Sequence, residues 1–357
     1  METKVIIDIR DVGSSLPVAN VQELASKNLK EIPHRYIRPE IRADEVLVNG
    51  SSQIPVIDMS KLVAGNTEYE TEMSNLHQAC KDWGFFQLIN HGAITEIENM
   101  KVAADGFFKL PLEEKMVYAQ QDGLEGYGHA FVMSEDQKLD WNDMIFICSA
   151  PESGRNMKFW PNNPTSFRPS LDEYSRQLHK IFISLVQSMA TNLGVEFREF
   201  VNMYLECAQG ITMNYYPPCS LADQVMGFTP HSDGSMLTLL VQVGEVEGLQ
   251  IRNSGKWIPI KPLPGAIIVN IADCMEIMSN GEYKSIEHRA VVNSEKERIS
   301  IAGFHNPSRT ATISPLPGLV KETAAKYKAV KFEDYAKMFL NSRLNGKSTL
   351  DAVKICN

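Results

Sequence analysis

The second half of the chain contains a series of short apolar segments, each interrupted by Gly, Pro or Asn. These segments recur at a spacing of about ten residues, which is typical of a β-sandwich or barrel. We predict strands at residues 211–216, 225–230, 236–242, 248–252, 257–260, 266–271, 283–292 and 298–305.

Helices and isolated strands are predicted on either side of this region. Apolar residues at helical spacing indicate helices at 18–30, 70–82, 94–108, 171–193 and 332–344. Short apolar runs indicate strands at 54–58 and 83–89. We divide the chain into an N-terminal extension with a helix, a supporting region of helices and short strands, the strand-rich core, and a C-terminal helical lid and tail: 1–53, 54–204, 205–308 and 309–357.

Composition narrows the class of protein. The 357 residues are 43% hydrophobic and 22% charged, as in an ordinary globular chain, and the formal net charge is −9. No dense basic segment is present, so we expect no nucleic-acid partner. No apolar run is long enough for a signal peptide or a membrane span, and the six cysteines are scattered without a Cys-x-x-Cys pair. We expect a cytoplasmic monomer without a disulfide scaffold.

The segment GFTPHSDGS contains two candidate metal ligands, His231 and Asp233. Residues two apart on an extended segment point to the same face, so both side chains can reach one ion. The best candidate for a third ligand is His288. Two histidines and one carboxylate on one side of a metal form the facial triad of non-haem Fe(II) oxygenases. A His-x-Asp pair is common by chance, so by itself it is only a hypothesis.

The positions of the third ligand and of a downstream arginine leave alternatives open. His288 shares a strand face with Ile286, so it should point into the apolar interior, where it could also be a core histidine bonded to the backbone. Arg298 and Ser300 share a face of the next strand, but isoleucines make the opposite face an equally good core face. An arginine on a strand is usually solvated.

An iron site that activates dioxygen needs electrons, and 2-oxoglutarate can supply them by chelating the metal and losing CO2. Its distal carboxylate then needs a fixed cation, and a guanidinium is planar, always charged and able to donate two parallel hydrogen bonds. Arg298 and Ser300 follow His288 by about ten residues and offer a guanidinium and a hydroxyl one strand from the metal.

This combination resembles the plant Fe(II)/2-oxoglutarate-dependent dioxygenase family. The sequence NYYPPC at 214–219 matches the cosubstrate strand of that family, and WGFF at 83–86 with NHG at 90–92 matches its N-terminal region. The similarity extends from residue 18 to residue 355. It is greatest to the senescence-related and alkaloid O-demethylase-like branch, which includes a norcoclaurine-synthase-like protein.

The resemblance implies a mixed α+β fold, in which a double-stranded β-helix (jelly roll) is flanked by N-terminal and C-terminal helices in a single compact catalytic unit. The implied cofactors are Fe(II), 2-oxoglutarate and O2, with ascorbate as an activator in vitro. The implied site residues are His231, Asp233 and His288 for the metal, and Asn214, Tyr216, Arg298 and Ser300 for 2-oxoglutarate. By family analogy the substrate wall comprises Phe131, Met144, Phe146, Thr212, Phe304 and His305, with core packing as the alternative for the aromatic residues.

The function that the resemblance implies is hydroxylation or O-demethylation of a small, largely apolar plant specialised metabolite, with release of succinate and CO2. Thr212 favours an alkaloid, because related flavonoid-acting enzymes often carry a basic residue there; flavonoids, coumarins, other phenolics and terpenoids stay open. The alternatives are a condensing or lyase enzyme on the same scaffold, an oxidase that uses ascorbate, and a non-catalytic metabolite-binding protein. Either the glycine-rich segment 122–131 or the helix at 332–344 could close over the substrate.

Overall fold

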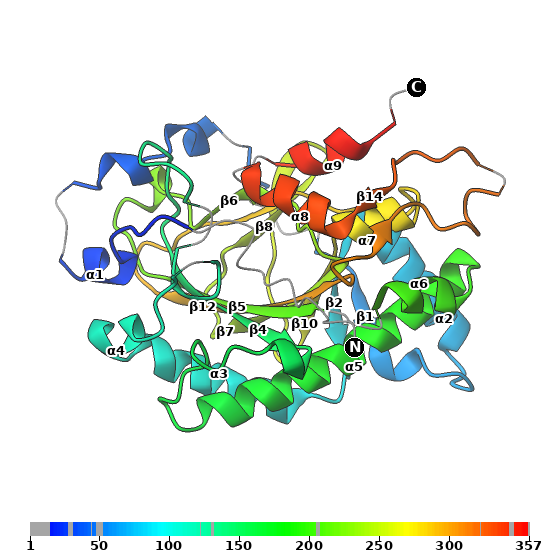
Figure 1. Cartoon of the computed structure of the whole chain (residues 1–357), viewed down its shortest axis with the longest axis horizontal. Coiled ribbons are helices and arrows are strands. Elements are labelled where there is room, and N and C mark those ends of the chain that lie inside the picture. Colours follow the sequence, from blue (N-terminus) through cyan, green and yellow to red (C-terminus); the bar gives the residue numbers. More distant parts are fainter. Residues whose placement is uncertain are drawn as a thin grey trace, which may run out of the picture.

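Two β-sheets form the centre of the molecule (Figure 1). The computed structural model describes residues 15–27, 31–43, 45–47, 53–121, 123–129, 132–204, 208–321, 323–342 and 346–355. The strands of the larger sheet follow one another in this order: β1 (Val56–Asp58), β2 (Phe85–Ile89), β10 (Ile267–Ile271), β7 (Leu237–Val243), β12 (Arg298–Asn306), β5 (Ala208–Tyr216), β4 (Asp143–Ala150) and β3 (Gly126–Gly128). The strands of the smaller sheet follow in the order β6 (Phe228–His231), β11 (His288–Ala290), β8 (Leu249–Asn253) and β9 (Lys256–Pro259). A separate pair joins β13 (Thr312–Ile313) to β14 (Val330–Lys331).

Strand β12 shows how alternation divides the larger sheet into an inner and an outer face. It pairs with β5 along its whole length, with Arg298 opposite Tyr216 and Phe304 opposite Gly210. Every second side chain of β12 faces the space between the sheets, and Ile299 and Ile301 between them belong to the main apolar core. On that outer face, a Cβ on Gly303 would lie 2.5 Å from Leu178, which shows how closely the neighbouring helix packs.

Two long helices cover the outer face of the larger sheet. Figure 1 shows α3 (Ile94–Phe108) and α5 (Phe167–Leu193) on one side of the strands, and α8 (Phe332–Asn341) and α9 (Ser348–Val353) on the other. The predicted apolar stripe of α5 is buried in the main core. The other helices are α1 (Val21–Ser26), α2 (Tyr69–Gln78), α4 (Leu112–Met116), α6 (Phe197–Tyr204) and α7 (Asp273–Met278).

The predicted mixed α+β architecture with a jelly-roll core is confirmed, and the differences lie in individual elements. The strand predicted at 283–292 is reduced to the three residues of β11. We did not predict β4 or α7, and the residues of both elements are almost all buried. An apolar run that is buried on all sides has no period that separates a strand from a helix. The helix predicted at 18–30 begins at Val21, and residues 28–30 lie outside the described residues.

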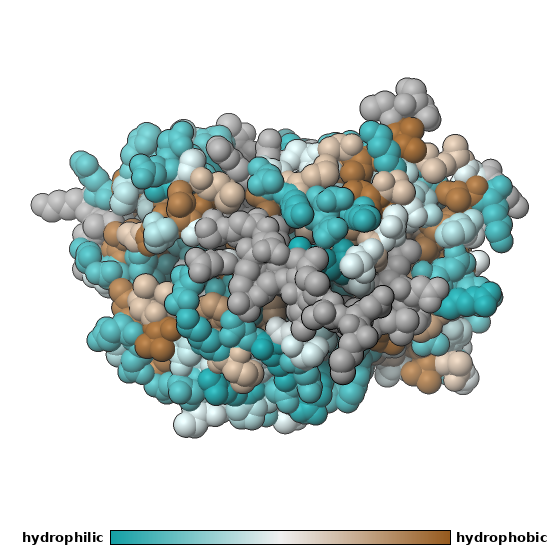
Figure 2. All heavy atoms as spheres, in the orientation of Figure 1, coloured by the Kyte–Doolittle hydropathy of each residue, from teal (hydrophilic) through white to brown (hydrophobic). Residues whose placement is uncertain are grey.

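The surface shown in Figure 2 is dominated by polar side chains, and apolar side chains form small, separate groups on it. Scattered apolar residues of this kind are normal on a folded protein. Within the described ranges, no helix combines the length and the apolar character that crossing a membrane requires.

Candidate active site

A cavity of about 310 Å³ lies between the two sheets. Its walls come from strands of both sheets, and α8 contributes to one side. Along β12, Arg298 and Phe304 both line it and are six residues apart, so they are separated by roughly 20 Å. The cavity is thus long enough for two small molecules placed on either side of a metal ion.

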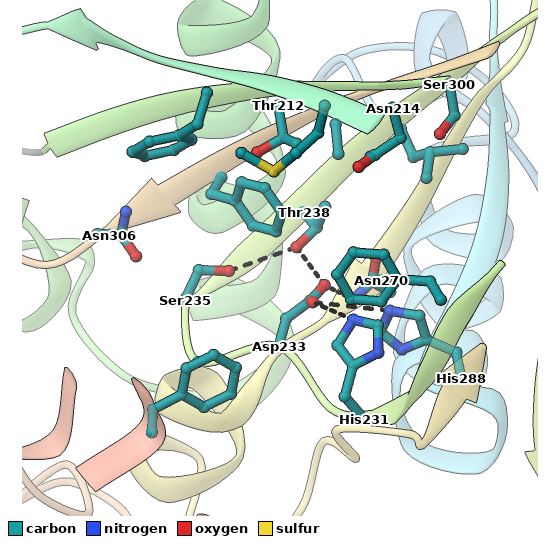
Figure 3. Close-up of a pocket in the computed structure, with 18 of the residues that line it drawn as sticks. Thr212, Asn214, His231, Asp233, Ser235, Thr238, Asn270, His288, Ser300 and Asn306 are labelled. Carbon is teal, nitrogen blue, oxygen red and sulfur yellow. Dashed lines mark hydrogen bonds and ion pairs between the residues drawn. The ribbon is translucent and has the colours of Figure 1, made fainter. Parts of the chain in front are cut away.

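His231, Asp233 and His288 converge on one point of this cavity (Figure 3). Antiparallel pairing places His288 of β11 directly opposite His231 of β6. One oxygen of Asp233, Oδ1, lies 3.4 Å from Nε2 of His231 and 3.6 Å from Nε2 of His288. Three donor atoms of this kind, all within 4.8 Å of one another, can bind a single ion.

Backbone carbonyls orient both imidazoles. Nδ1 of His231 lies 2.8 Å from the carbonyl oxygen of Thr229, and Nδ1 of His288 lies 3.1 Å from that of Ile286. An Nδ1–H that donates to a carbonyl leaves Nε2 as the unprotonated ligand atom. A core histidine would explain the Nδ1 contact of His288, but it would not explain why its Nε2 faces a carboxylate and a second imidazole.

The carboxylate of Asp233 is held by its other oxygen. Oδ2 accepts hydrogen bonds from Oγ1 of Thr238 at 2.6 Å and from Nδ2 of Asn270 at 2.8 Å, which leaves Oδ1 directed at the histidines (Figure 3). Partners of this kind fix a ligand and tune its affinity for metal. Neither residue was predicted from the sequence, because the contacts of Asp233 with Thr238 of β7 and Asn270 of β10 form only when separate strands come together.

The electrostatics of Asp233 and His288 suit a divalent cation. Burial disfavours ionised Asp233, but the charge of His288 and the hydrogen bond from His231 outweigh it, so the pKa of this carboxyl is lowered. Burial and the neighbouring His231 lower the pKa of His288 to about 4. Burial also opposes the charge on His231, but the hydrogen bond to Asp233 raises its pKa. An ionised carboxylate and a neutral imidazole are the forms that bind metal.

Arg298 lies at the far end of the cavity and is 3% exposed, so it is not a solvated surface arginine. Its Nε donates to Oε1 of Gln242 at 3.1 Å, and its guanidinium lies 5.1 Å from the centre of the Tyr216 ring. Its Nη1 is buried and has no hydrogen-bond partner among the described residues. Burial lowers the pKa of Arg298, and a bound anion would stabilise the charged form.

The other expected cosubstrate residues surround this arginine. Asn214, Tyr216 and Ser300 all line the cavity, and the amide oxygen Oδ1 of Asn214 is also buried without a partner in the described part of the chain. Gly248 makes room for the arginine, because a Cβ at that position would lie 2.7 Å from Cδ of Arg298. Local sequence holds no signal for this glycine, since the contact joins residues fifty positions apart.

The opposite part of the cavity is largely apolar and contains most of the expected substrate wall. Met144, Phe146, Thr212 and Phe304 line it. Residue 131, also expected there, lies outside the described residues. Within the described part of the segment 122–131 the cavity is lined by Leu124 alone, whereas α8 contributes Phe332, Glu333, Tyr335, Ala336, Phe339 and Leu340. Of the two lid candidates, α8 is the one that forms a wall.

The expectation that His305 lines the cavity was wrong. Its ring stacks on Phe182 of α5 at 4.3 Å, and its Nε2 lies 2.9 Å from Nε2 of Gln209. Consecutive residues of a strand face opposite sides, so Phe304 and His305 cannot both line one cavity. Burial lowers the pKa of His305 to about 3, which keeps it neutral as a part of the core.

Comparison with known proteins agrees with this geometry. Residues 207–307 match the model of the 2OG-Fe(II) oxygenase superfamily, and residues 54–163 match that of the non-haem dioxygenase in morphine synthesis N-terminal region. S-norcoclaurine synthase 1 of Coptis japonica is 51% identical, with 98% of this chain and 99% of the relative aligned. Oxoglutarate-dependent flavonoid 7-O-demethylase 1 of Ocimum basilicum is 46% identical, over 97% of this chain and 93% of the relative.

A solved structure shares the whole architecture. The crystal structure of JOX2 in complex with 2OG, Fe and JA is 34% identical and superimposes with a TM-score of 0.88, covering 96% of this chain and 99% of that chain. Likeness over both chains at this identity includes the catalytic core as well as the flanking helices. The chain therefore belongs to the 2-oxoglutarate- and Fe(II)-dependent oxygenase superfamily.

Proposed function

We propose that this dioxygenase hydroxylates or O-demethylates a small, flat, largely apolar plant specialised metabolite, with an alkaloid as the favoured class. As a member of its family it uses Fe(II), 2-oxoglutarate and O2. The observation that carries the proposal is the division of one cavity by the His231, Asp233 and His288 cluster. A buried, unsatisfied arginine lies on one side of that cluster and an apolar wall on the other.

Each polar residue of the site has a distinct role in this proposal. His231, Asp233 and His288 would hold Fe(II) through Nε2, Oδ1 and Nε2, while Thr238 and Asn270 keep Oδ1 of Asp233 directed at the ion. Three protein ligands leave positions open for other ligands. Iron with 2-oxoglutarate and O2 supplies the oxidising power for an unactivated C–H bond.

Arg298 would bind the distal carboxylate of 2-oxoglutarate, with Ser300, Tyr216 and Asn214 beside it. A buried guanidinium with a free N–H matches a carboxylate in charge and in geometry. The hydrogen bond to Gln242 and the contact with the Tyr216 ring hold the guanidinium in place before the cosubstrate arrives. The protein thus orients the cosubstrate instead of contributing a reactive group.

The substrate class is inferred from the remaining wall. Met144, Phe146 and Phe304 present apolar surface, and Thr212 adds a hydroxyl without charge. A wall of this composition suits a flat aromatic ligand with few polar anchors. Hydroxylation of an O-methyl carbon would give a hemiacetal that breaks down to formaldehyde and a phenol, so demethylation needs no further catalytic residue. The similarity to a flavonoid 7-O-demethylase supports this outcome.

A succinate-release assay tests the proposal. Purified protein with Fe(II), 2-oxoglutarate and ascorbate is offered a panel of alkaloids, flavonoids, coumarins and terpenoids, with and without O-methyl groups. We expect at least one compound to stimulate succinate formation and to yield one hydroxylated or demethylated product per succinate. Formaldehyde should accompany demethylation. Succinate release that no compound stimulates would count against a small apolar substrate.

A second candidate is a condensing enzyme, because S-norcoclaurine synthase 1 is 51% identical. Such an enzyme would form its product without consuming 2-oxoglutarate. Product formation in the absence of 2-oxoglutarate, with no succinate released, would favour this candidate. The buried, unpaired Nη1 of Arg298 favours oxidation, because a condensing reaction has no use for it.

We propose that the active unit is a single chain, because one chain supplies the candidate metal ligands, the cosubstrate residues and the described cavity wall. Light scattering of the active protein tests this proposal, and an obligate dimer would contradict it. Location in the cytoplasm stays a prediction, which a fluorescent fusion at either terminus would test.

A further inference from the structure

A fully buried carboxylate behind the metal ligands accepts three hydroxyl hydrogen bonds. This is Asp273, at the first turn of α7. Its Oδ1 accepts from Oγ of Ser285 at 2.6 Å, and its Oδ2 accepts from the hydroxyl of Tyr335 at 2.7 Å and from Oγ of Ser232 at 3.2 Å. The three donors are themselves at most 1% exposed. The roles proposed above for iron, cosubstrate and substrate do not use this group.

Each donor comes from a different part of the active site. Ser232 lies between the candidate ligands His231 and Asp233, and Ser285 lies three residues before His288. The backbone adds a further tie, because the N–H of residue 273 donates to the carbonyl oxygen of Asp233 at 2.8 Å. The same carboxylate therefore contacts both segments that carry the metal ligands.

The third donor belongs to the helix that forms the substrate wall. Tyr335 lies on α8, and its neighbours Phe332, Ala336 and Phe339 line the cavity. The N-terminal end of α8 is held separately, by backbone bonds from Phe332 and Glu333 to the segment after β12. The phenol of Tyr335 instead reaches inward to the base of the metal site. A buried hydroxyl-to-carboxylate bond in this position links the helix to the ligand segments directly.

We propose that Asp273 is a positioning residue that couples occupancy of the metal site to the order of α8, so that the substrate wall becomes fully ordered only when metal is bound. The inference rests on the proposed metal site. Metal binding fixes His231, Asp233 and His288 relative to one another, and Ser232 and Ser285 move with them. Their shared acceptor is then fixed as well, and with it the partner of Tyr335. Coupling of this kind requires two sites and a physical link, and the three hydrogen bonds supply that link.

Hydrogen exchange of the full-length protein tests the coupling without turnover. Exchange of the α8 amides is compared with and without Co(II) plus 2-oxoglutarate, since Co(II) occupies such sites without needing to be kept reduced. We expect the ligands to slow α8 exchange several-fold in the wild type. Tyr335→Phe, which removes only the hydroxyl, should abolish most of that slowing. Tyr283→Phe is the matched control, because Tyr283 is equally buried and its hydroxyl contacts His77, away from the site.

A second variant acts from the metal side. Ser285→Ala leaves α8 untouched, yet it should also weaken the metal-dependent slowing of α8 exchange, with Co(II) affinity reduced by up to about tenfold. A purely local packing role for Tyr335 predicts no change in α8 when Ser285 is replaced. If both variants retain the wild-type slowing, the coupling is refuted. If the wild type binds no Co(II), the proposed metal site fails, and the inference fails with it.

Discussion

The two ends of the cavity are built in different ways. At the proposed cosubstrate end, Arg298 donates a hydrogen bond to Gln242 of the neighbouring strand β7, and strand register sets its position. Asp233, at the proposed metal site, accepts hydrogen bonds from Thr238 of β7 and Asn270 of β10. At the substrate end, the wall combines apolar side chains from β4, β5 and β12 with one face of α8. The first end depends on directional contacts, and the second depends on shape.

In this proposal the polar end of the cavity determines the reaction, and the apolar end determines which compound is oxidised. A single substitution of a buried, hydrogen-bonded side chain removes its function, because the group that it bonded to is left buried without a partner. An apolar wall made of several elements can change its shape one side chain at a time at a small cost. We therefore expect large effects on catalysis at the cosubstrate end and small effects, confined to the substrate, at the other.

The largest effect should follow loss of a metal ligand. Asp233→Ala or His231→Ala should reduce substrate-dependent succinate release by at least about a thousandfold, since metal assistance is worth several kcal/mol. Succinate assays at saturating Fe(II) measure the effect. His34→Ala, at an exposed histidine outside the cavity, is the control. Full activity of either variant would show that the replaced residue is not a metal ligand.

A smaller effect is expected at the cosubstrate anchor. Arg298→Lys keeps the charge but loses the planar pair of donors, so the KM for 2-oxoglutarate should rise about 10- to 100-fold. The ranking of substrates should stay the same. Arg252→Lys, at a half-exposed arginine of β8, provides a matched substitution. An unchanged KM for 2-oxoglutarate would mean that the distal carboxylate binds elsewhere.

Removal of a ligand's supporting partner should have a more moderate effect. Thr238→Val deletes the hydroxyl that donates to Oδ2 of Asp233 while preserving side-chain volume. We expect the Fe(II) concentration for half-maximal activity to rise about tenfold, with most of the activity restored by added iron. Thr312→Val, at an exposed threonine of β13, is the control. Wild-type iron dependence would show that Asn270 alone orients the carboxylate.

The smallest effect is expected at the apolar wall. Phe304→Leu should change the KM for the best compound of the panel a few-fold, which corresponds to about 1 kcal/mol of lost contact. The KM for 2-oxoglutarate and the iron dependence should not change. Ile301→Val, on the outer face of the same strand, controls for the stability of β12. An equal change in both KM values would show that the two ends of the cavity are not independent.

The candidate metal ligands could be predicted from the sequence because their signals are local. The two-residue spacing of His231 and Asp233 and the alternation around His288 depend only on the geometry of an extended chain. The same rule could have excluded His305 once Phe304 was placed in the cavity wall. It could not decide the inner face of β12, because Ile299 and Ile301 offered an equally apolar alternative.

Residue type and short spacing were enough to predict most of the core strands, the candidate metal donors and the arginine-serine pair, because each of these signals is local along the chain. The inward orientation of Arg298, the space that Gly248 leaves for it and the contacts of Asp273 with three separate segments emerge only in the folded molecule. These contacts join residues that are distant along the chain, and their geometry follows from strand register and from the packing of α8. A local pattern carries no information about such pairings, because they exist only after the sheets have closed.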